Sequence, residues 1–299
     1  NIENFLERST ETLKKINLDY EIIFVLDPSD DNTENIILNN IEKNKNIKLI
    51  VLSRRFGQPS ATMAGIHNVN GDICVIIDCD LQDPPELMLE MYNKILDGND
   101  VVYAKRIKRK GETFFKKIIS KFGYRVIEKI SDVKIPKDTG DYRIITKKII
   151  NQLKELKETN AFLRGLVAYV GYKQTFVEYE RDERKDGESK YNKYFGSLRI
   201  AFNGIVGFSS KPLFLMSITG FIFAIISFLI GVYYIYQKIT NPQITPGLSS
   251  TILMITFFSG IQLLGLGLLG EYIGRIYDEV KDRPNFIIDK KYNFDEKES

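Results

Sequence analysis

The chain has 299 residues, enough for one large domain and a further segment, and its formal net charge is only +3. Such a small charge does not indicate a nucleic-acid-binding protein, and one histidine with two cysteines cannot build a Cys/His metal site. Cys74 and Cys79 lie five residues apart in one apolar run, so we expect reduced cytoplasmic thiols rather than a disulfide. Because the chain begins with Asn1 and not methionine, we expect that a preceding segment is missing.

Short apolar runs alternate with polar helical segments through the first hundred residues. Apolar strands separated by helices predict an α/β fold with a mostly parallel, Rossmann-like sheet and helices on both faces. Ligands bind beyond the carboxyl ends of such strands, where Asp27 and Asp78 stand. Either aspartate alone is typical of a turn or helix cap, but two at matching strand ends predict a site. Strands are predicted at 21–27, 47–53, 72–78 and 100–104, and helices at 31–44, 59–69 and 85–96.

Two charged segments follow these elements. Residues 105–137 are basic and have a helical pattern, and residues 181–194 form a dense run of charge that by default is a solvated loop. The large domain therefore extends over residues 1–190, and an amphipathic juxtamembrane segment at 191–211 either lies in the membrane interface or is a linker helix.

Two long apolar runs, 212–236 and 248–270, each exceed the roughly 20 residues that a membrane-spanning helix needs. We predict a two-helix transmembrane domain at 212–274 and a tail at 275–299. Tyrosines at 233, 234 and 236 resemble an aromatic belt, and Glu271 and Arg275 have the spacing of an ion pair on one helix.

The positions of the basic residues predict the orientation of the chain. The loop between the two spans carries only Lys238, whereas the outer ends are rich in lysine and arginine. The domain and the tail are therefore predicted to be cytoplasmic, in a multi-pass protein of the inner (plasma) membrane. The flanking cations are Lys190, Lys193, Arg199, Lys211, Arg275, Lys281 and Arg283.

The segment DCDLQDPPE, residues 78–86, is the strongest chemical motif in the chain. Asp78 and Asp80 are two residues apart at the end of an apolar strand and can converge on one metal ion. Carboxylates suit Mg²⁺ or Mn²⁺, and such an ion can bridge a diphosphate and offset the charge on a leaving group. An isolated Asp-x-Asp is a weak signal, but this longer motif between a strand and a helix is specific.

This motif resembles the family 2 glycosyltransferases of the GT-A fold, and more narrowly the polyprenyl-phosphate glycosyltransferases. That group includes dolichyl-phosphate mannose synthases and bacterial bactoprenol glucosyltransferases. The resemblance spans nearly the whole chain, and two C-terminal spans are typical of the bacterial branch. It implies a metal site at Asp78, Asp80 and Gln82, and a nucleotide-sugar site at Asp27, Asp31, Arg54 and Asp78.

Further segments carry the same resemblance. The sequence DPSDDNT at 27–33 is similar to the family's nucleotide-binding turn, although Leu26 and Pro28 depart from the pattern. The segment SRRFGQPSATMA at 53–64 resembles the family's Ser-Arg-Asn-Phe-Gly-Lys, with Arg55 in place of the usual asparagine. The family opens with an apolar strand, which we expect to lie in the segment preceding Asn1. GDYR at 140–143 resembles the family's Gly-Asp-Phe-Arg, FLRG at 162–165 matches, and RKDGESKY at 184–191 resembles a mobile loop over the active site. The implied catalytic residues are Asp141, Arg143 and Asp80, with Asp141 either a base or a positioning group.

A polyprenyl phosphate is already anionic and needs cations more than a general base. Arginine forks suit phosphate groups. The alternative for Arg106 and Arg109 is the exposed start of a basic helix. The predicted lipid-phosphate ligands are Arg106, Arg109, Arg164, Arg184, Ser189 and Lys190.

The predicted reaction is a metal-dependent, inverting transfer of a sugar to an undecaprenyl- or dolichyl-type phosphate, for a cell-envelope glycan. UDP-glucose is the leading donor by resemblance to the bacterial branch. One alternative is another membrane glycosyltransferase such as a polysaccharide synthase, whose Gln-x-x-Arg-Trp motif is incompatible with a chain without tryptophan.

A second alternative is a non-catalytic membrane anchor or assembly partner with a degenerate transferase domain, and a soluble nucleotidyltransferase is disfavoured by the spans. A homo-oligomer also stays open. Glycines in the second span could serve contacts between chains or between the two helices of one chain, and they are Gly260, Gly265, Gly267 and Gly270.

Overall fold

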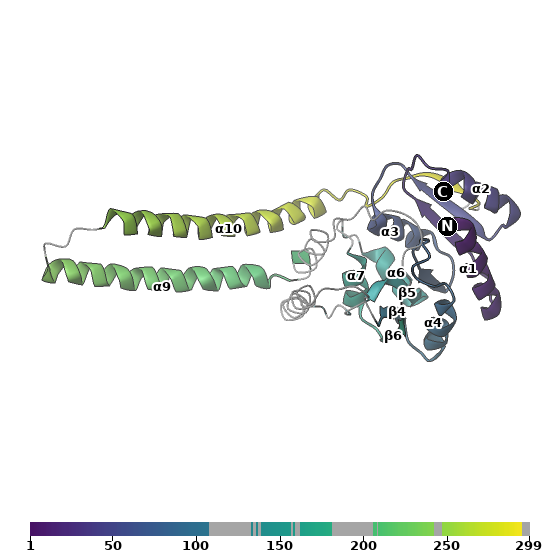
Figure 1. Cartoon of the computed structure of the whole chain (residues 1–299), viewed down its shortest axis with the longest axis horizontal. Coiled ribbons are helices and arrows are strands. Elements are labelled where there is room, and N and C mark those ends of the chain that lie inside the picture. The colour runs from purple at the N-terminus through teal and green to yellow at the C-terminus, as the bar shows by residue number, and fades with distance from the viewer. Residues whose placement is uncertain are drawn as a thin grey trace.

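The structure of the chain, a computed structural model, has an α/β body from which a long helical hairpin extends (Figure 1). It describes residues 1–107, 133, 136, 139–156, 158, 162–180, 206–207, 209–241 and 247–294. Within the segments predicted at 105–137, 181–194 and 191–211, residues 108–132 and 181–205 therefore lie outside the described residues.

A three-stranded sheet forms one part of the body. Strand β1 (Ile22–Leu26) pairs in parallel with β2 (Ile47–Leu52), and β7 (Ile288–Tyr292) pairs antiparallel with the other edge of β2. Side chains of β2 alternate between the two faces, so Leu49 packs on one side and Ile50 on the other, and both are fully buried. The apolar run predicted as a strand is thus the centre of this sheet.

The other part is a four-stranded sheet in the order β3-β5-β4-β6. Strand β5 (Thr139–Thr146) lies antiparallel between β3 (Ile73–Ile76) and β4 (Val101–Arg106), and β6 (Gln174–Tyr179) lies parallel to β4. Residues 101–104 of β4 are buried on both faces of the sheet.

The α/β class is confirmed, but the expectation of a mostly parallel sheet needs a correction. Of the five strand pairings in the described part of the chain, two are parallel and three are antiparallel. The antiparallel partners, β5 and β7, come from segments whose strands were not predicted. Each is separated by a long stretch of sequence from the strand before it, so the local sequence pattern carries no information on its direction.

Helices cover both faces of each sheet, as predicted (Figure 1). Helix α4 (Leu87–Leu96) buries Met88 and Met91 on one face of the larger sheet, while α6 (Lys147–Glu155) and α7 (Leu163–Val170) cover the other. Helices α1 (Ile2–Ile16) and α2 (Thr33–Lys43) pack on one side of the smaller sheet, and α3 (Gln58–Asn68) packs on the opposite side.

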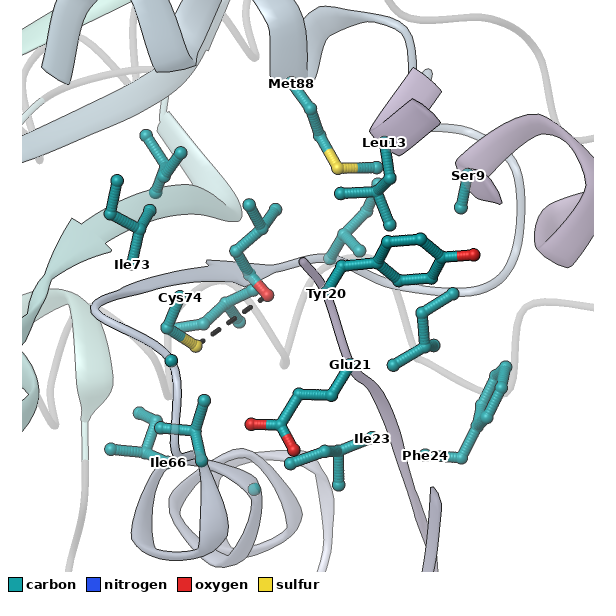
Figure 2. Close-up of a pocket in the computed structure, with 18 of the residues that line it drawn as sticks. Ser9, Leu13, Tyr20, Glu21, Ile23, Phe24, Ile66, Ile73, Cys74 and Met88 are labelled. Carbon is teal, nitrogen blue, oxygen red and sulfur yellow. Dashed lines mark hydrogen bonds between the residues drawn. The ribbon is translucent and has the colours of Figure 1, made fainter. Parts of the chain in front are cut away.

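An apolar cavity of about 640 Å³ separates the facing edges of β1 and β3 (Figure 2). Ile23 and Phe24 line it from one strand and Ile73 and Cys74 from the other, with Tyr20 near its end. In the described part of the chain neither of these two edges pairs with another strand. The expectation that a strand precedes residue 1 stays a prediction, and these edges are where a further strand could pair.

Two long helices make the hairpin. Helix α9 (Lys211–Thr240) has 30 residues and α10 (Leu248–Val280) has 33, so each is about 45 Å or more in length, more than a bilayer core is thick. No residue of α9 is buried, and both helices are long and apolar enough to cross a membrane. Met216 of α9 packs against Gly265 of α10, so that glycine serves contact within one chain. The expected pair Arg275–Glu271 is present at 3.2 Å.

The segment after α10 returns to the body instead of ending as a simple tail. The backbone N–H of Ser53 donates to the carbonyl of Ile287, and Phe286 lies edge-on to His67 of α3 at 5.6 Å between ring centroids. The chain beyond α10 therefore rejoins the α/β body.

Candidate functional site

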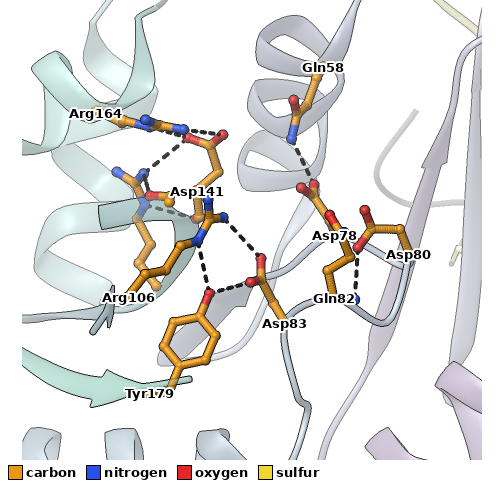
Figure 3. A network of polar contacts seen from close by, with 11 residues as sticks. Gln58, Asp78, Asp80, Gln82, Asp83, Arg106, Asp141, Arg164 and Tyr179 are labelled. Carbon is orange, nitrogen blue, oxygen red and sulfur yellow. Dashed lines mark hydrogen bonds and ion pairs between the residues drawn. The ribbon is translucent and has the colours of Figure 1, made fainter. Parts of the chain in front are cut away.

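The register of two strands brings the acidic turn and the GDYR segment together. Ile76 of β3 pairs with Arg143 of antiparallel β5. Continued by two residues, the same register sets Asp78 opposite Asp141, although the two aspartates are far apart in sequence. The carboxyl end of β3 and the beginning of β5 thus make one site (Figure 3).

Asp78 lies among other carboxylates. Burial is the largest cause that raises the pKa of Asp78 to about 6. The charge of Asp141 is the second cause, and the charges of Asp80 and Asp83 act in the same direction. A hydrogen bond of 2.7 Å from Gln58 Nε2 to Asp78 Oδ1 opposes this shift of the pKa. The turn is therefore a region of concentrated negative charge.

The backbone of the acidic turn is tightly constrained. Asp80 Oδ1 accepts a hydrogen bond of 3.1 Å from the backbone N–H of Gln82. Between them Leu81 has φ 61°, a left-handed conformation that costs energy for a residue with a branched side chain. Leu81 also packs against the core cluster beneath α1 and α2. The turn is thus held in a strained shape that directs Asp78 and Asp80 to the same region (Figure 3).

Asp141 is held by arginines. Arg164 of α7 makes a two-pronged contact, with Nε 2.9 Å from Oδ1 and Nη2 3.0 Å from Oδ2. Burial is the largest single influence and raises the pKa of Asp141, whereas the hydrogen bond and the charge of Arg164 lower it. Arg143 and Arg106 act in the same direction as Arg164, and the net result is a pKa below the usual value.

Arg143 lies behind Asp141 and is fully buried. Its Nε donates to the Asp141 carbonyl at 3.0 Å, and its guanidinium stacks at 5.4 Å from the ring centre of Tyr103. Among the residues that the structure describes, Nη1 has no hydrogen-bond partner. Arg143 thus supports Asp141 from within the core, and its catalytic role stays a prediction.

Arg106 is the last residue of β4, in register with Tyr179 of β6. The alternative that Arg106 begins an exposed basic helix is wrong, because the residue belongs to a strand and only 19% of its side chain is exposed. Its Nε donates to the Tyr179 hydroxyl at 3.2 Å, and Nη2 lies 3.7 Å from Asp83 Oδ2. Tyr179 donates in turn to Asp83 (Figure 3).

The predicted nucleotide-binding residues lie at the ends of β1 and β2. Both carboxylate oxygens of Asp27 accept backbone N–H groups, from Phe56 at 3.1 Å and Gly57 at 2.9 Å. Asp31 accepts the backbone N–H of Thr33 at the start of α2, and Arg54 stacks 3.9 Å from the ring centre of Phe56. In this structure the two aspartates hold loops in shape, and their contact with a nucleotide stays a prediction.

Four predicted lipid-phosphate ligands lie outside the described residues, namely Arg109, Arg184, Ser189 and Lys190. The two described members of that set, Arg106 and Arg164, both lie within the electrostatic influence of Asp141. The structure therefore brings together the acidic turn, Asp141 and two of the predicted phosphate-binding arginines.

The donor set of the acidic turn fits a hard divalent cation that is shared with a substrate. Among the described residues no three His, Cys, Asp or Glu side chains enclose a metal ion. Mg²⁺, however, is commonly held by one or two carboxylates together with substrate phosphate oxygens. Asp78 and Asp80 fit that arrangement, because burial and then the neighbouring carboxylates raise the pKa of Asp78, and a cation between the two aspartates would offset that concentrated negative charge.

Three residues at this site were missed by the sequence reasoning: Gln58, Asp83 and Tyr179. Asp83 lies inside the recognised motif, and its burial, with 1% exposed, was the only feature that set it apart. Gln58 lies inside the segment 53–64 that resembles a family motif but was not singled out there, and Tyr179 stands at the end of a strand that no motif marks. Only their distance to the site in the folded chain identifies them.

Comparison with known proteins gives one family. Residues 1–154 match the family model described as Glycosyl transferase family 2. The uncharacterized glycosyltransferase YkcC of Bacillus subtilis is 45% identical over 296 residues, which cover 99% of this chain and 91% of that protein. The bactoprenol glucosyl transferase of Shigella phage SfII is 38% identical over 272 residues, covering 91% of this chain and 88% of its own. That of Shigella phage SfX is 37% identical over 281 residues, covering 94% and 91%.

Proposed function

Since the chain belongs to glycosyl transferase family 2 and is a glycosyltransferase, we propose that it transfers a hexose from a nucleotide-sugar to a polyprenyl phosphate at a membrane surface. The observation that carries this proposal is the meeting of a carboxylate-rich turn with an arginine-lined aspartate at the end of one sheet. Such a site offers cation-binding groups and anion-binding groups side by side, which suits a reaction between two phosphate-bearing substrates.

The acceptor is proposed from the relatives and from the hairpin. Two relatives that align over nearly the whole chain carry the name bactoprenol glucosyl transferase, and bactoprenol is a polyprenyl lipid. Two helices long enough to cross a membrane follow the catalytic body, and their apolar side chains are exposed along their length. A lipid acceptor explains why a sugar transferase would carry such a hairpin.

The donor is proposed to be UDP-glucose, held by its diphosphate near Asp78 and Asp80. A divalent cation bound there would neutralise charge that develops on the leaving nucleoside diphosphate. Asp27 and Arg54 lie at the neighbouring strand ends, on the side of the site where the nucleoside would lie. The glucose assignment rests on the names of the relatives.

The reaction is proposed to be one displacement at the anomeric carbon, which inverts its configuration. The oxygen of the lipid phosphate forms the new bond, and the nucleoside diphosphate departs with the electron pair of the bond that breaks. A phosphate monoester is already ionised at neutral pH, so no side chain has to remove a proton from it. We therefore assign Asp141, whose pKa is held low by Arg164, to positioning rather than to base catalysis.

The body and the C-terminal segment are proposed to be cytoplasmic. Positive charge flanks the outer ends of both helices, whereas the inner ends and the loop between them carry a single lysine, Lys238 in the last turn of α9. The pairing of β7 with β2 supports a common side for both ends of the hairpin, because the chain returns to the same body after α10.

The test is a transfer assay on membrane-inserted protein with undecaprenyl phosphate, Mn²⁺ and radiolabelled nucleotide-sugars, followed by extraction of lipid-linked label. UDP-glucose should label the lipid, and Asp80→Ala should reduce the rate at least about a hundredfold, because a group that binds the leaving diphosphate is removed. The matched control is Asp72→Asn, an exposed aspartate at the opposite end of β3, which should retain activity.

Two results would contradict the proposal. Activity that persists in Asp80→Ala or in excess chelator would remove the cation site from the reaction. Binding of nucleotide-sugar without label in any lipid, by folded protein, would favour the alternative of a non-catalytic membrane partner.

A further inference from the structure

Asp83 and Tyr179 have no role in the reaction proposed above, yet they form a buried polar contact beside the site. Asp83 is 1% exposed, and the carboxylate accepts the hydroxyl hydrogen of Tyr179. A buried carboxylate is costly unless a hydrogen bond and a nearby cation compensate for lost water. Here the cation is Arg106, whose Nη2 lies 3.7 Å from Asp83 Oδ2.

The same two residues fix the direction of the Arg106 guanidinium. The Tyr179 hydroxyl accepts from Arg106 Nε at 3.2 Å and donates to Asp83, so one hydroxyl connects the arginine with the carboxylate (Figure 3). Burial, followed by the hydrogen bond to Asp83, raises the pKa of Tyr179 to about 12, so its proton is present at neutral pH. Tyr179 and Asp83 thus fix the positions of two nitrogens of the Arg106 guanidinium, Nε and Nη2.

The backbone of Gly140 packs directly against the Arg106 guanidinium. A methyl group added at residue 140 would lie 2.7 Å from Arg106 Nη2, closer than such contacts occur. The guanidinium therefore lies against the bare backbone of the GDYR segment, directly before Asp141. Arg106 is held by four elements at once: the turn after β3, its own strand β4, the start of β5 and the end of β6.

The remaining nitrogen is left for a ligand. Within the described residues the contacts of Arg106 run through Nε and Nη2, and Nη1 makes no hydrogen bond. The positive charge of Arg106 also lowers the pKa of Asp141, which lies at the centre of the site. An oriented cation with a spare donor, close to the acidic turn but separate from it, suits a phosphate group.

We propose that Asp83 and Tyr179 are positioning residues that hold Arg106 in the orientation in which it binds the phosphate of the lipid acceptor. This inference rests on the proposed function and specifies which residues give the site its affinity for the acceptor. Neither residue touches the substrates, and both act through Arg106. Gly140 is the position that makes room for this orientation.

The experiment measures KM for undecaprenyl phosphate and, separately, for UDP-glucose with membrane-inserted Tyr179→Phe, Asp83→Asn and Gly140→Ala. Each variant should raise the acceptor KM about tenfold, the effect expected when one charge-assisted hydrogen bond is misaligned. The donor KM should stay within about twofold, because binding of the nucleotide-sugar does not depend on this arginine. Arg106→Lys, which loses the fork itself, should show the largest acceptor effect.

Two variants separate this role from a general loss of stability. Tyr142→Phe removes a hydroxyl that donates 3.1 Å to the Pro84 carbonyl, in the same turn but without contact to Arg106, and should leave both KM values unchanged. Gly140→Ala needs no strained backbone, since residue 140 is not among the positive-φ glycines, and it displaces only the end of a flexible side chain.

The outcomes distinguish this inference from the proposed function. Lipid-linked transfer by the unaltered protein, with an acceptor KM unchanged in Tyr179→Phe and Gly140→Ala, would overturn the positioning role alone. An equal rise of both KM values would also overturn it. Absence of lipid-linked transfer by the unaltered, folded protein would overturn the proposed function and this inference with it.

Discussion

Asp78 lies two residues beyond the end of β3 and Asp141 lies near the start of the adjacent β5, but the surroundings of the two aspartates differ in charge. Around Asp78 the neighbouring charges are carboxylates, and burial with this repulsion raises its pKa to about 6. Around Asp141 the neighbours are arginines, and they outweigh burial and hold its pKa below the usual value. One carboxylate is compensated within the chain, whereas the other needs a cation that the described residues do not supply.

The charge of Asp141 is balanced by arginines of the chain itself, whereas the charge of Asp78 is balanced only when a cation binds with the substrate. The side of Asp141 is assembled before any ligand binds, so its removal should affect folding and activity together. Burial and neighbouring carboxylates disfavour the charge of Asp78, so replacing this carboxylate should lower the activity and raise the stability of the fold. The two halves of the site can therefore be distinguished by substitutions of the same chemical kind.

The largest effect is expected for Asp141→Asn. Loss of this carboxylate leaves the fully buried Arg143 without its compensating charge, and breaking a buried pair costs about 3 kcal/mol or more. The thermal midpoint of the solubilised protein should fall, and lipid-linked transfer should be lost. Asp100→Asn is the control, a half-buried aspartate at the opposite end of the sheet that accepts from Thr146, and it should keep most activity. An Asp141→Asn protein as stable as the parent would contradict the compensation described here.

A smaller effect of opposite sign is expected for Asp78→Asn. The amide keeps an oxygen for the Gln58 hydrogen bond but removes a charge whose ionisation is unfavourable in the fold. At neutral pH and in the presence of chelator the variant should be more stable by about 1 to 2 kcal/mol, a figure reduced for partial solvent exposure. Transfer should be lost. Equal destabilisation by both aspartate substitutions would show that charge repulsion at the turn is negligible.

The pH dependence of these two variants should differ in sign. The raised pKa of Asp78 means that the folded state holds its proton more tightly, so its cost appears as pH rises from 3.8 to about 6 and is complete above that range. The lowered pKa of Asp141 means that its stabilisation is present above 3.8 and is lost as pH falls through the folded value. Thermal midpoints of both variants and the parent, measured from below pH 3.8 up to about pH 7, cover both titration ranges and give the two differences directly.

The smallest effect is expected for Gln58→Met, which removes the hydrogen bond to Asp78 at nearly constant volume. The pKa of Asp78 should rise further, and the acid limb of the activity profile should move to higher pH. Stability should change by less than about 1 kcal/mol, the usual net value of one partly exposed hydrogen bond. Gln152→Met, at an exposed position of α6, is the matched control. A profile identical to that of the parent would exclude any influence of Gln58 on the acidic turn.

Most of the early elements and the central motif could be predicted from the sequence because their signals are local. Strand β2 was expected at 47–53 and spans Ile47–Leu52, and helix α3 was expected at 59–69 and spans Gln58–Asn68. The two long apolar helices were predicted from uninterrupted apolar length alone. The motif at 78–86 was read as cation-binding because residue type and spacing carry that chemistry without further context.

Long-range pairing accounts for the rest. Strand β7 follows the hairpin by only a few residues, and its mixed sequence IDKKY has no apolar alternation that would indicate a strand. It is a strand because the edge of β2 offers unpaired backbone groups that it can satisfy. Strand β5 likewise forms by pairing with segments distant in sequence, β3 and β4. That pairing brings Asp141 close to Asp78.

The chain's composition and periodicity were thus sufficient for its α/β class, its two apolar helices and its acidic turn, since each depends on residues close together in sequence. The direction of β5 and β7, the burial of Arg143 and the contact of Asp83 with Tyr179 and Arg106 depend on register between distant segments. Register is chosen by the free energy of the whole packed sheet, which no single segment contains.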